Sequence, residues 1–99
     1  MRLDFTERAL RSLERTLELL ADRYSPEQRV AYTEKIFERT RILLRYPRAG
    51  QREERLASLG QDHRRLVCDH FKIVYFIDGD VIRITDIFDS RRDPEEMIG

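Results

Sequence analysis

The side chains best suited to chemistry in this sequence are arginines, which make up seventeen of its nineteen basic residues. Arg91 and Arg92 stand side by side in the charged segment Asp89–Pro94, and Arg52 and Arg55 lie in an earlier polar stretch. The planar guanidinium group binds carboxylates and phosphates through paired hydrogen bonds. These residues therefore indicate contact with an acidic protein or a phosphate backbone, and a solvated surface is an equal alternative.

The charge is balanced overall but unevenly distributed along the chain. Residues 41–72 carry eight cations and four anions, a net charge of +4, whereas residues 73–99 carry three cations and seven anions, a net charge of −4. The nineteen cations and nineteen anions of the whole chain cancel. A neutral protein is poorly suited to deep docking in RNA, which requires a strongly basic surface.

The other reactive side chains give little sign of catalysis or metal binding. Cys68 is the sole cysteine, so it forms neither an intrachain disulfide nor a cysteine-based zinc site, and we expect it in the core. His63 and His70 are flanked by charged residues, so we expect them at the surface or in turns. The aspartates between residues 86 and 93 form only a weak metal-binding pattern. With no phosphate-binding loop or hydrolase motif, we expect no cofactor and no metal.

Two strands joined by a tight turn are the firmest structural prediction. Residues 71–78 and 81–88 are rich in β-branched and aromatic side chains, and Asp78-Gly79 between them suits a type I′ turn. A third strand over 63–68 precedes them. The predicted meander leads directly into the arginine-containing C-terminal segment.

Two amphipathic helices are predicted before these strands. The first begins near Thr6 and carries an apolar stripe made of Leu10, Leu13, Leu17, Leu20 and Tyr24. The second begins at Pro26, where Ser25 and Gln28 can form a capping box, and ends before Tyr46. Its stripe comprises Val30, Thr33, Ile36, Phe37, Thr40, Leu43 and Leu44. The short connection predicts an antiparallel helical hairpin.

The predicted elements define one α+β domain over residues 1–99 with the order β-α-α-β-β-β, in which the helical hairpin packs on a mainly antiparallel sheet. Residues 2–5 are expected to add an edge strand, residues 45–62 to form a long loop, and residues 93–96 to form a helical turn. No membrane-spanning stretch or signal peptide is visible, so we expect no membrane contact and a cytoplasmic location.

Four segments in this order resemble the RelE/ParE superfamily of bacterial type II toxins over nearly the whole chain. They are Thr6–Leu13, Leu43–Gly50, Phe71–Gly79 and Ile87–Pro94. The resemblance implies a small toxin, of the kind associated with plasmid stabilisation, that is neutralised by a co-encoded antitoxin in a hetero-oligomeric complex.

The superfamily divides into two activities. RelE-like members resemble ribosome-dependent mRNA endoribonucleases, which need cations at the transition state and commonly a C-terminal tyrosine or histidine. Here Arg64, Arg65 and Arg83 would supply the cations, but neither tyrosine nor histidine follows Ile87. The Arg-Arg-Asp-Pro ending looks more like the ParE branch, whose members bind DNA gyrase and trap it on cleaved DNA. We therefore expect a binding inhibitor rather than an enzyme, with a ribonuclease or a non-toxic antitoxin-binding relic as alternatives.

The ParE-like interpretation assigns two binding surfaces. The expected target-binding residues are Arg91, Arg92, Asp93, Pro94, Arg52 and Arg55. An amphipathic antitoxin segment would enter a groove between the helical hairpin and the sheet. The expected antitoxin-binding residues are Leu13, Leu17, Tyr24, Phe37 and Tyr75. Internal ion pairs for Arg91 and Arg92, and a core position for Tyr75, are the structural alternatives.

Overall fold

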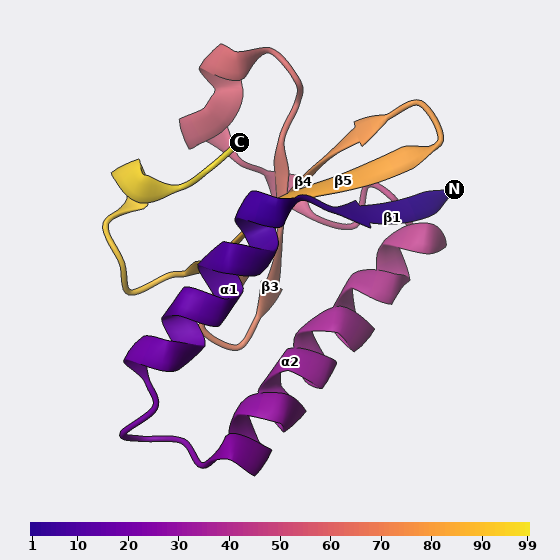
Figure 1. Cartoon of the computed structure of the whole chain (residues 1–99). Coiled ribbons are helices and arrows are strands. Elements are labelled where there is room, and N and C mark those ends of the chain that lie inside the picture. Colours follow the sequence, from indigo (N-terminus) through magenta and orange to yellow (C-terminus); the bar gives the residue numbers. More distant parts are fainter.

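The predicted strand pair forms the centre of a five-stranded sheet in the computed structural model, which describes every residue of the chain (Figure 1). Strands β4 (Phe71–Asp78) and β5 (Val81–Asp89) are antiparallel, and β3 (Arg64–Cys68) pairs with β4. The edges are β1 (Arg2–Phe5), which runs parallel to β5, and the short β2 (Gln51–Arg52), which is antiparallel to β3. The predicted α+β class and mainly antiparallel sheet are confirmed.

The turn between β4 and β5 differs in type from the prediction. Asp78 pairs with Val81, so the loop residues are Gly79 and Asp80. Only Gly79 has a positive φ, of 60°, whereas a type I′ turn needs positive φ at both positions. A positive φ at the first loop residue alone is the pattern of a type II′ turn, which places glycine at that position.

A bulge in β5 attaches the C-terminal tail (residues 90–99) to the sheet. Val74 pairs with Asp86 and the next residue of β4 pairs with Ile84, which leaves Thr85 as the extra residue. The Thr85 hydroxyl donates to the Ile98 carbonyl at 3.1 Å, and the Ile98 N–H donates to Asp86 Oδ2 at 2.9 Å. The adjacent side chains of Thr85 and Asp86 therefore both hold the backbone of Ile98 in the tail.

Both main helices begin at the predicted caps. Helix α1 spans Glu7–Leu19 and α2 spans Pro26–Thr40. The Thr6 side chain accepts a hydrogen bond from the N–H three residues later. Ser25 and Gln28 form both bonds of the capping box, at 2.8 and 3.2 Å.

The two helices are buried to different extents. The buried residues of α1 are Ala9, Leu13, Thr16 and Leu17. In α2 only Ile36 and Thr40 are buried, and Figure 1 shows α1 and α2 running side by side from the loop that connects them. Val30, predicted to lie on the buried stripe, is 59% exposed. The first half of α2 is therefore a helix with an apolar face that the rest of the chain does not cover.

Each face of the sheet has its own hydrophobic core. The main core joins the helices to Leu66, Cys68, Phe71, Ile73, Tyr75, Ile82, Ile84 and Ile87. On the opposite face, Val74 and Phe88 of the sheet pack with Leu56 and Met97. The C-terminal tail therefore covers the sheet face that the helices leave open.

Residues 45–62 are more ordered than the predicted loop. They contain β2 and a 3₁₀-helix, η2 (Glu54–Leu59), which ends at Gly60 in the left-handed conformation. Two further 3₁₀-helices are η1 (Arg41–Leu44), which directly follows α2, and η3 (Pro94–Glu96), the predicted C-terminal turn. The prediction missed β2 because two polar residues carry no strand pattern and are ordered by pairing with β3. None of the helices has the length and apolar character needed to cross a membrane.

The histidines and the cysteine divide between core and surface. Cys68 is buried as predicted, and His70 is exposed. His63 was expected at the surface, but it is only 1% exposed and its ring lies 5.0 Å from that of Phe76 in an edge-on arrangement. The tail covers it, because Gly99 lies against its imidazole. Flanking charges misled the prediction, since they lie on residues whose side chains point elsewhere.

His63 is expected to make folding sensitive to mild acid. Neither ring nitrogen has a hydrogen-bond partner, and burial lowers the pKa of the imidazole below its ordinary value. The unfolded chain therefore binds a proton more readily than the folded one, so the free energy of unfolding falls as pH drops below about 6.5. Urea denaturation between about pH 7.5 and pH 5 measures this slope. His63→Leu is expected to flatten it, and an unchanged slope in that variant would contradict the assignment.

Candidate partner-binding surfaces

An open groove between α1 and α2 is the first candidate site. Its volume is about 510 Å³, and its lining is mainly apolar. The lining residues are Leu10, Leu13, Glu14, Leu17, Glu18, Pro26, Arg29, Val30, Thr33 and Phe37. Leu13 and Leu17 are buried, while Leu10 and Val30 are 40% and 59% exposed. The two helices thus present an apolar groove with charged side chains in its lining, which suits the apolar face of an amphipathic helix.

A groove between the helical hairpin and the sheet was expected. The groove in the structure lies instead between the two helices. Leu13, Leu17 and Phe37, three of the residues expected to bind the antitoxin, line this groove because they occupy the facing sides of α1 and α2. Tyr24 does not line it. The first helix ends before Tyr24, whose ring instead packs 5.6 Å from that of Tyr32.

Tyr75, also expected to contact the antitoxin, is fully buried in the core. Its hydroxyl donates to the Pro47 carbonyl at 2.7 Å and accepts from the Gly50 N–H at 2.9 Å. Burial raises the pKa of this phenol above its ordinary value. Tyr75 therefore holds the turn before β2 in place and offers no surface to a partner.

In the C-terminal tail, Arg91 forms the internal ion pair considered as the alternative to target binding. Its Nε lies 3.0 Å from Asp89 Oδ1 and its Nη2 lies 2.7 Å from Asp89 Oδ2. Asp89 is 5% exposed, and the guanidinium group holds the pKa of its carboxyl below the ordinary value. Arg91 thus neutralises a buried carboxylate at the end of β5 and anchors the start of the tail.

Arg92 is held at the surface by several contacts. Its Nη2 lies 2.6 Å from Glu96 Oε2, and its guanidinium carbon lies 5.3 Å from the centre of the Phe88 ring. Asp93 caps η3 by accepting from the N–H two residues later, and Pro94 occupies the first position of that turn. The Arg-Arg-Asp-Pro motif is therefore a small folded unit that fixes one guanidinium group in an accessible position.

Arg52 and Arg55 lie on the other segment that was predicted to bind the target. Arg52 is mostly exposed and pairs with Asp62 at 2.8 Å, and Arg55 is exposed on η2. Leu56 of η2 packs with Met97 on the sheet face opposite the helices. The tail and η2 thus share one face of the molecule, although no hydrogen bond or ion pair joins their arginines.

The three cations considered for a ribonuclease do not converge. Arg64 donates to the Gly50 carbonyl at 2.9 Å, and Arg65 pairs with Glu53 at 3.3 Å. Arg83 lies on β5, which β4 separates from β3, and it pairs with Asp4 at 2.7 Å and with Asp78 at 3.0 Å. Each guanidinium group is engaged by its own partners, so the arrangement does not form a shared anionic transition-state site.

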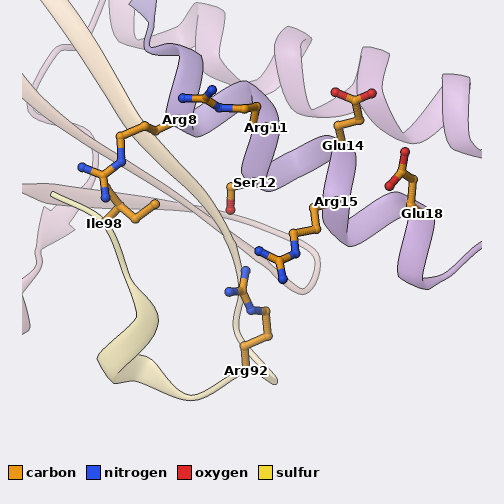
Figure 2. Close-up of a pocket in the computed structure, with 8 residues that line it drawn as sticks. All are labelled: Arg8, Arg11, Ser12, Glu14, Arg15, Glu18, Arg92 and Ile98. Carbon is orange, nitrogen blue, oxygen red and sulfur yellow. The ribbon is translucent and has the colours of Figure 1, made fainter.

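A second recess, missed in the sequence, lies beside α1 and the C-terminal tail (Figure 2). Its volume is about 640 Å³, and half of its lining residues are arginine. The lining comprises Arg8, Arg11, Ser12, Glu14, Arg15, Glu18, Arg92 and Ile98. The spacing of Arg8, Arg11 and Arg15 is the one sequence signal that could have grouped them, since it places them on one helix face, but no pattern in the sequence places the tail beside that face.

The helical pair on a mixed sheet, with a groove between the helices, defines the RelE/ParE-like toxin fold. The structure is similar to a solved chain from a structure titled "Chromosomal ParDE TA system from P. aeruginosa", with a TM-score of 0.73 and 20% sequence identity. The similarity covers 90% of this chain and 95% of that one. No match was found among curated proteins.

The family itself follows from the sequence. Residues 3–94 match the family model described as "ParE toxin of type II toxin-antitoxin system, parDE". The chain belongs to the ParE toxin family of type II toxin-antitoxin systems.

Proposed function

We propose that this ParE-family toxin inhibits DNA gyrase by binding to it, and that a co-encoded antitoxin neutralises the toxin. Family membership and the folded Arg-Arg-Asp-Pro unit support gyrase as the target. The dispersal of Arg64, Arg65 and Arg83 gives the ribonuclease alternative no structural support. The proposal places the toxin in the cytoplasm, where it meets both gyrase and antitoxin.

The tail carries the main contact in this proposal. Arg92 is oriented by Glu96 and Phe88, so little side-chain freedom is lost when it pairs with a carboxylate or phosphate of the target. Asp93 and Pro94 fix the geometry of the turn, and Arg91 secures it through Asp89. Arg55 on η2 extends the contact along the same face of the sheet, and Arg52 extends it to the sheet edge at β2.

Neutralisation is assigned to the groove between α1 and α2. An amphipathic antitoxin helix would bury Leu10 and Val30, which the toxin alone leaves exposed. Leu13, Leu17 and Phe37 would form the floor of this contact. Burial of an apolar helix face supplies a driving force proportional to the area removed from water.

Purified wild-type chain is expected to inhibit gyrase supercoiling and to accumulate cleaved DNA, and Arg92→Gln is expected to weaken this inhibition by about tenfold or more. Arg41→Gln is the matched control, because Arg41 is an exposed arginine, paired with Glu38, on η1. Equal inhibition by the Arg92 variant and the wild type would show that the tail does not bind the target.

Expression without an antitoxin separates the alternatives in cells. Growth arrest with filamentation and cleaved DNA supports gyrase, whereas mRNA cleavage on ribosomes would reassign the chain to the ribonuclease branch. No arrest at all would identify a non-toxic antitoxin-binding relic. The Arg91→Ala plus Arg92→Ala double variant needs a thermal-denaturation control, because loss of Arg91 leaves the buried Asp89 carboxylate unpaired.

A further inference from the structure

The recess beside α1 is lined by Arg8, Arg11 and Arg15, which the proposed gyrase and groove contacts leave unexplained, together with Arg92. Arg8, Arg11 and Arg15 are exposed, and none of them forms an ion pair within the molecule. Figure 2 shows Arg15 pointing toward Arg92 of the tail. Two distant parts of the chain thus direct guanidinium groups at one space of about 640 Å³.

The spacing of these arginines suits a row of carboxylates. Arg8, Arg11 and Arg15 follow one face of α1, and at a rise of about 1.5 Å per residue they span about 10 Å. An acidic peptide segment lying along the helix places successive carboxylates at comparable intervals. Each guanidinium group can bind a carboxylate through two parallel hydrogen bonds.

The recess favours a peptide over a nucleic acid. Glu14 and Glu18 line it on one side, and Figure 2 shows their carboxylates pointing away from Arg15 and Arg92. A continuous phosphate backbone crossing this surface would meet both carboxylates, and the chain as a whole carries no net positive charge to attract it. A peptide can place acidic residues only where the arginines are.

The same two glutamates connect the recess to the apolar groove. Glu14 and Glu18 line both spaces, so they form a ridge on α1 with the groove on one side and the arginines on the other. A chain lying in the groove therefore reaches the arginines by crossing this ridge. Any cation in that chain at the crossing would meet Glu14 or Glu18.

We propose that an acidic segment of the antitoxin occupies the recess formed by Arg8, Arg11, Arg15 and Arg92. This proposal rests on the proposed function, because it takes the antitoxin as the occupant of the adjoining groove. One bound chain then fills the groove, crosses the ridge and covers Arg92. Neutralisation follows directly, since the bound segment competes with the target for the same guanidinium group.

The site is tested first with a labelled decaglutamate peptide and, for comparison, a short DNA duplex. The variant combines Arg8→Gln, Arg11→Gln and Arg15→Gln. The matched control combines Arg2→Gln, Arg23→Gln and Arg45→Gln, which removes the same charge from exposed positions elsewhere. We expect the recess variant to lose about tenfold or more of the peptide affinity in fluorescence anisotropy, and the control to change by less than about twofold. Failure of the wild type to bind the peptide, or binding of the duplex in preference at the same arginines, would overturn the proposal.

The antitoxin that co-purifies with the wild-type chain provides the second test. We expect the recess variant to bind it about tenfold or more weakly while still inhibiting gyrase, since Arg92 is unchanged. Unchanged antitoxin affinity in the variant would show that the recess is not part of the antitoxin interface. The gyrase assay of the wild type without antitoxin tests the proposed function separately, so the two failures are distinguishable.

Discussion

An aspartate at both Leu10 and Val30 is expected to weaken antitoxin binding by at least about 100-fold, because each carboxylate would be buried unpaired in an apolar contact. Both residues line the groove between α1 and α2 and are exposed in the toxin alone. The substitutions therefore leave the core intact, and we expect the free energy of unfolding to change by less than about 1 kcal/mol. Isothermal titration calorimetry with the antitoxin measures the first effect and thermal denaturation the second.

The control places aspartates at Leu19 and Val67, which are 75% and 54% exposed but lie outside the groove. This pair is expected to bind the antitoxin like the wild type. In cells, the groove variant is expected to arrest growth even when the antitoxin is co-expressed. Tight binding by the groove variant would show that the antitoxin uses another surface.

Replacing Gly50 by alanine is expected to lower the free energy of unfolding by about 2–4 kcal/mol, because a Cβ atom there has no space. It would lie 2.7 Å from the Arg65 carbonyl oxygen and 2.8 Å from the Tyr75 ring and hydroxyl. Arg65 belongs to β3, which is paired on both sides, so its backbone cannot retreat. Displacing Tyr75 would also break its bonds to Gly50 and Pro47. We expect the midpoint of thermal unfolding to fall by about 10 °C or more.

Gly60→Ala is the matched control for this prediction. Gly60 has a φ of 74° and open space around its Cα, so an alanine there meets only backbone strain, which costs about 1–2 kcal/mol. Tyr75→Phe separates the hydroxyl from the ring. If Gly50→Ala were no more destabilising than Gly60→Ala, the close packing of the turn before β2 would not limit stability.

Local signals in the sequence predicted most of the secondary structure. Thr6, Ser25 and Gln28 act as the predicted caps because capping depends on residues within one helical turn. The β4–β5 pair was predicted from its side-chain composition and its glycine-containing turn. The same local reasoning placed the first helix as far as Tyr24, because periodicity alone does not show where a chain must turn toward its next helix.

The candidate binding surfaces could be anticipated from the sequence only in part, because they depend on how the elements pack together. Leu13, Leu17 and Phe37 were identified from their spacing, but only the placement of α2 beside α1 brings them together in one groove. Tyr75 has the composition of an interface residue, and only its packing shows that it is a core residue with two hydrogen bonds. His63 was misplaced for the same reason, since its burial comes from Phe76 and the end of the tail.

The sequence by itself determined the two main helices, four of the five strands, their order, the charged turn after β5 and the resemblance to the RelE/ParE superfamily, because short-range spacing and composition carry all of these. Only the tertiary structure shows which arginines form ion pairs with buried carboxylates and which are accessible to a partner. Arg91 neutralises a buried carboxylate, whereas Arg92 joins three arginines of α1 that are more than seventy residues away in the chain. Such a site arises from the packing of a tail against a helix, and no pattern within either segment specifies that contact.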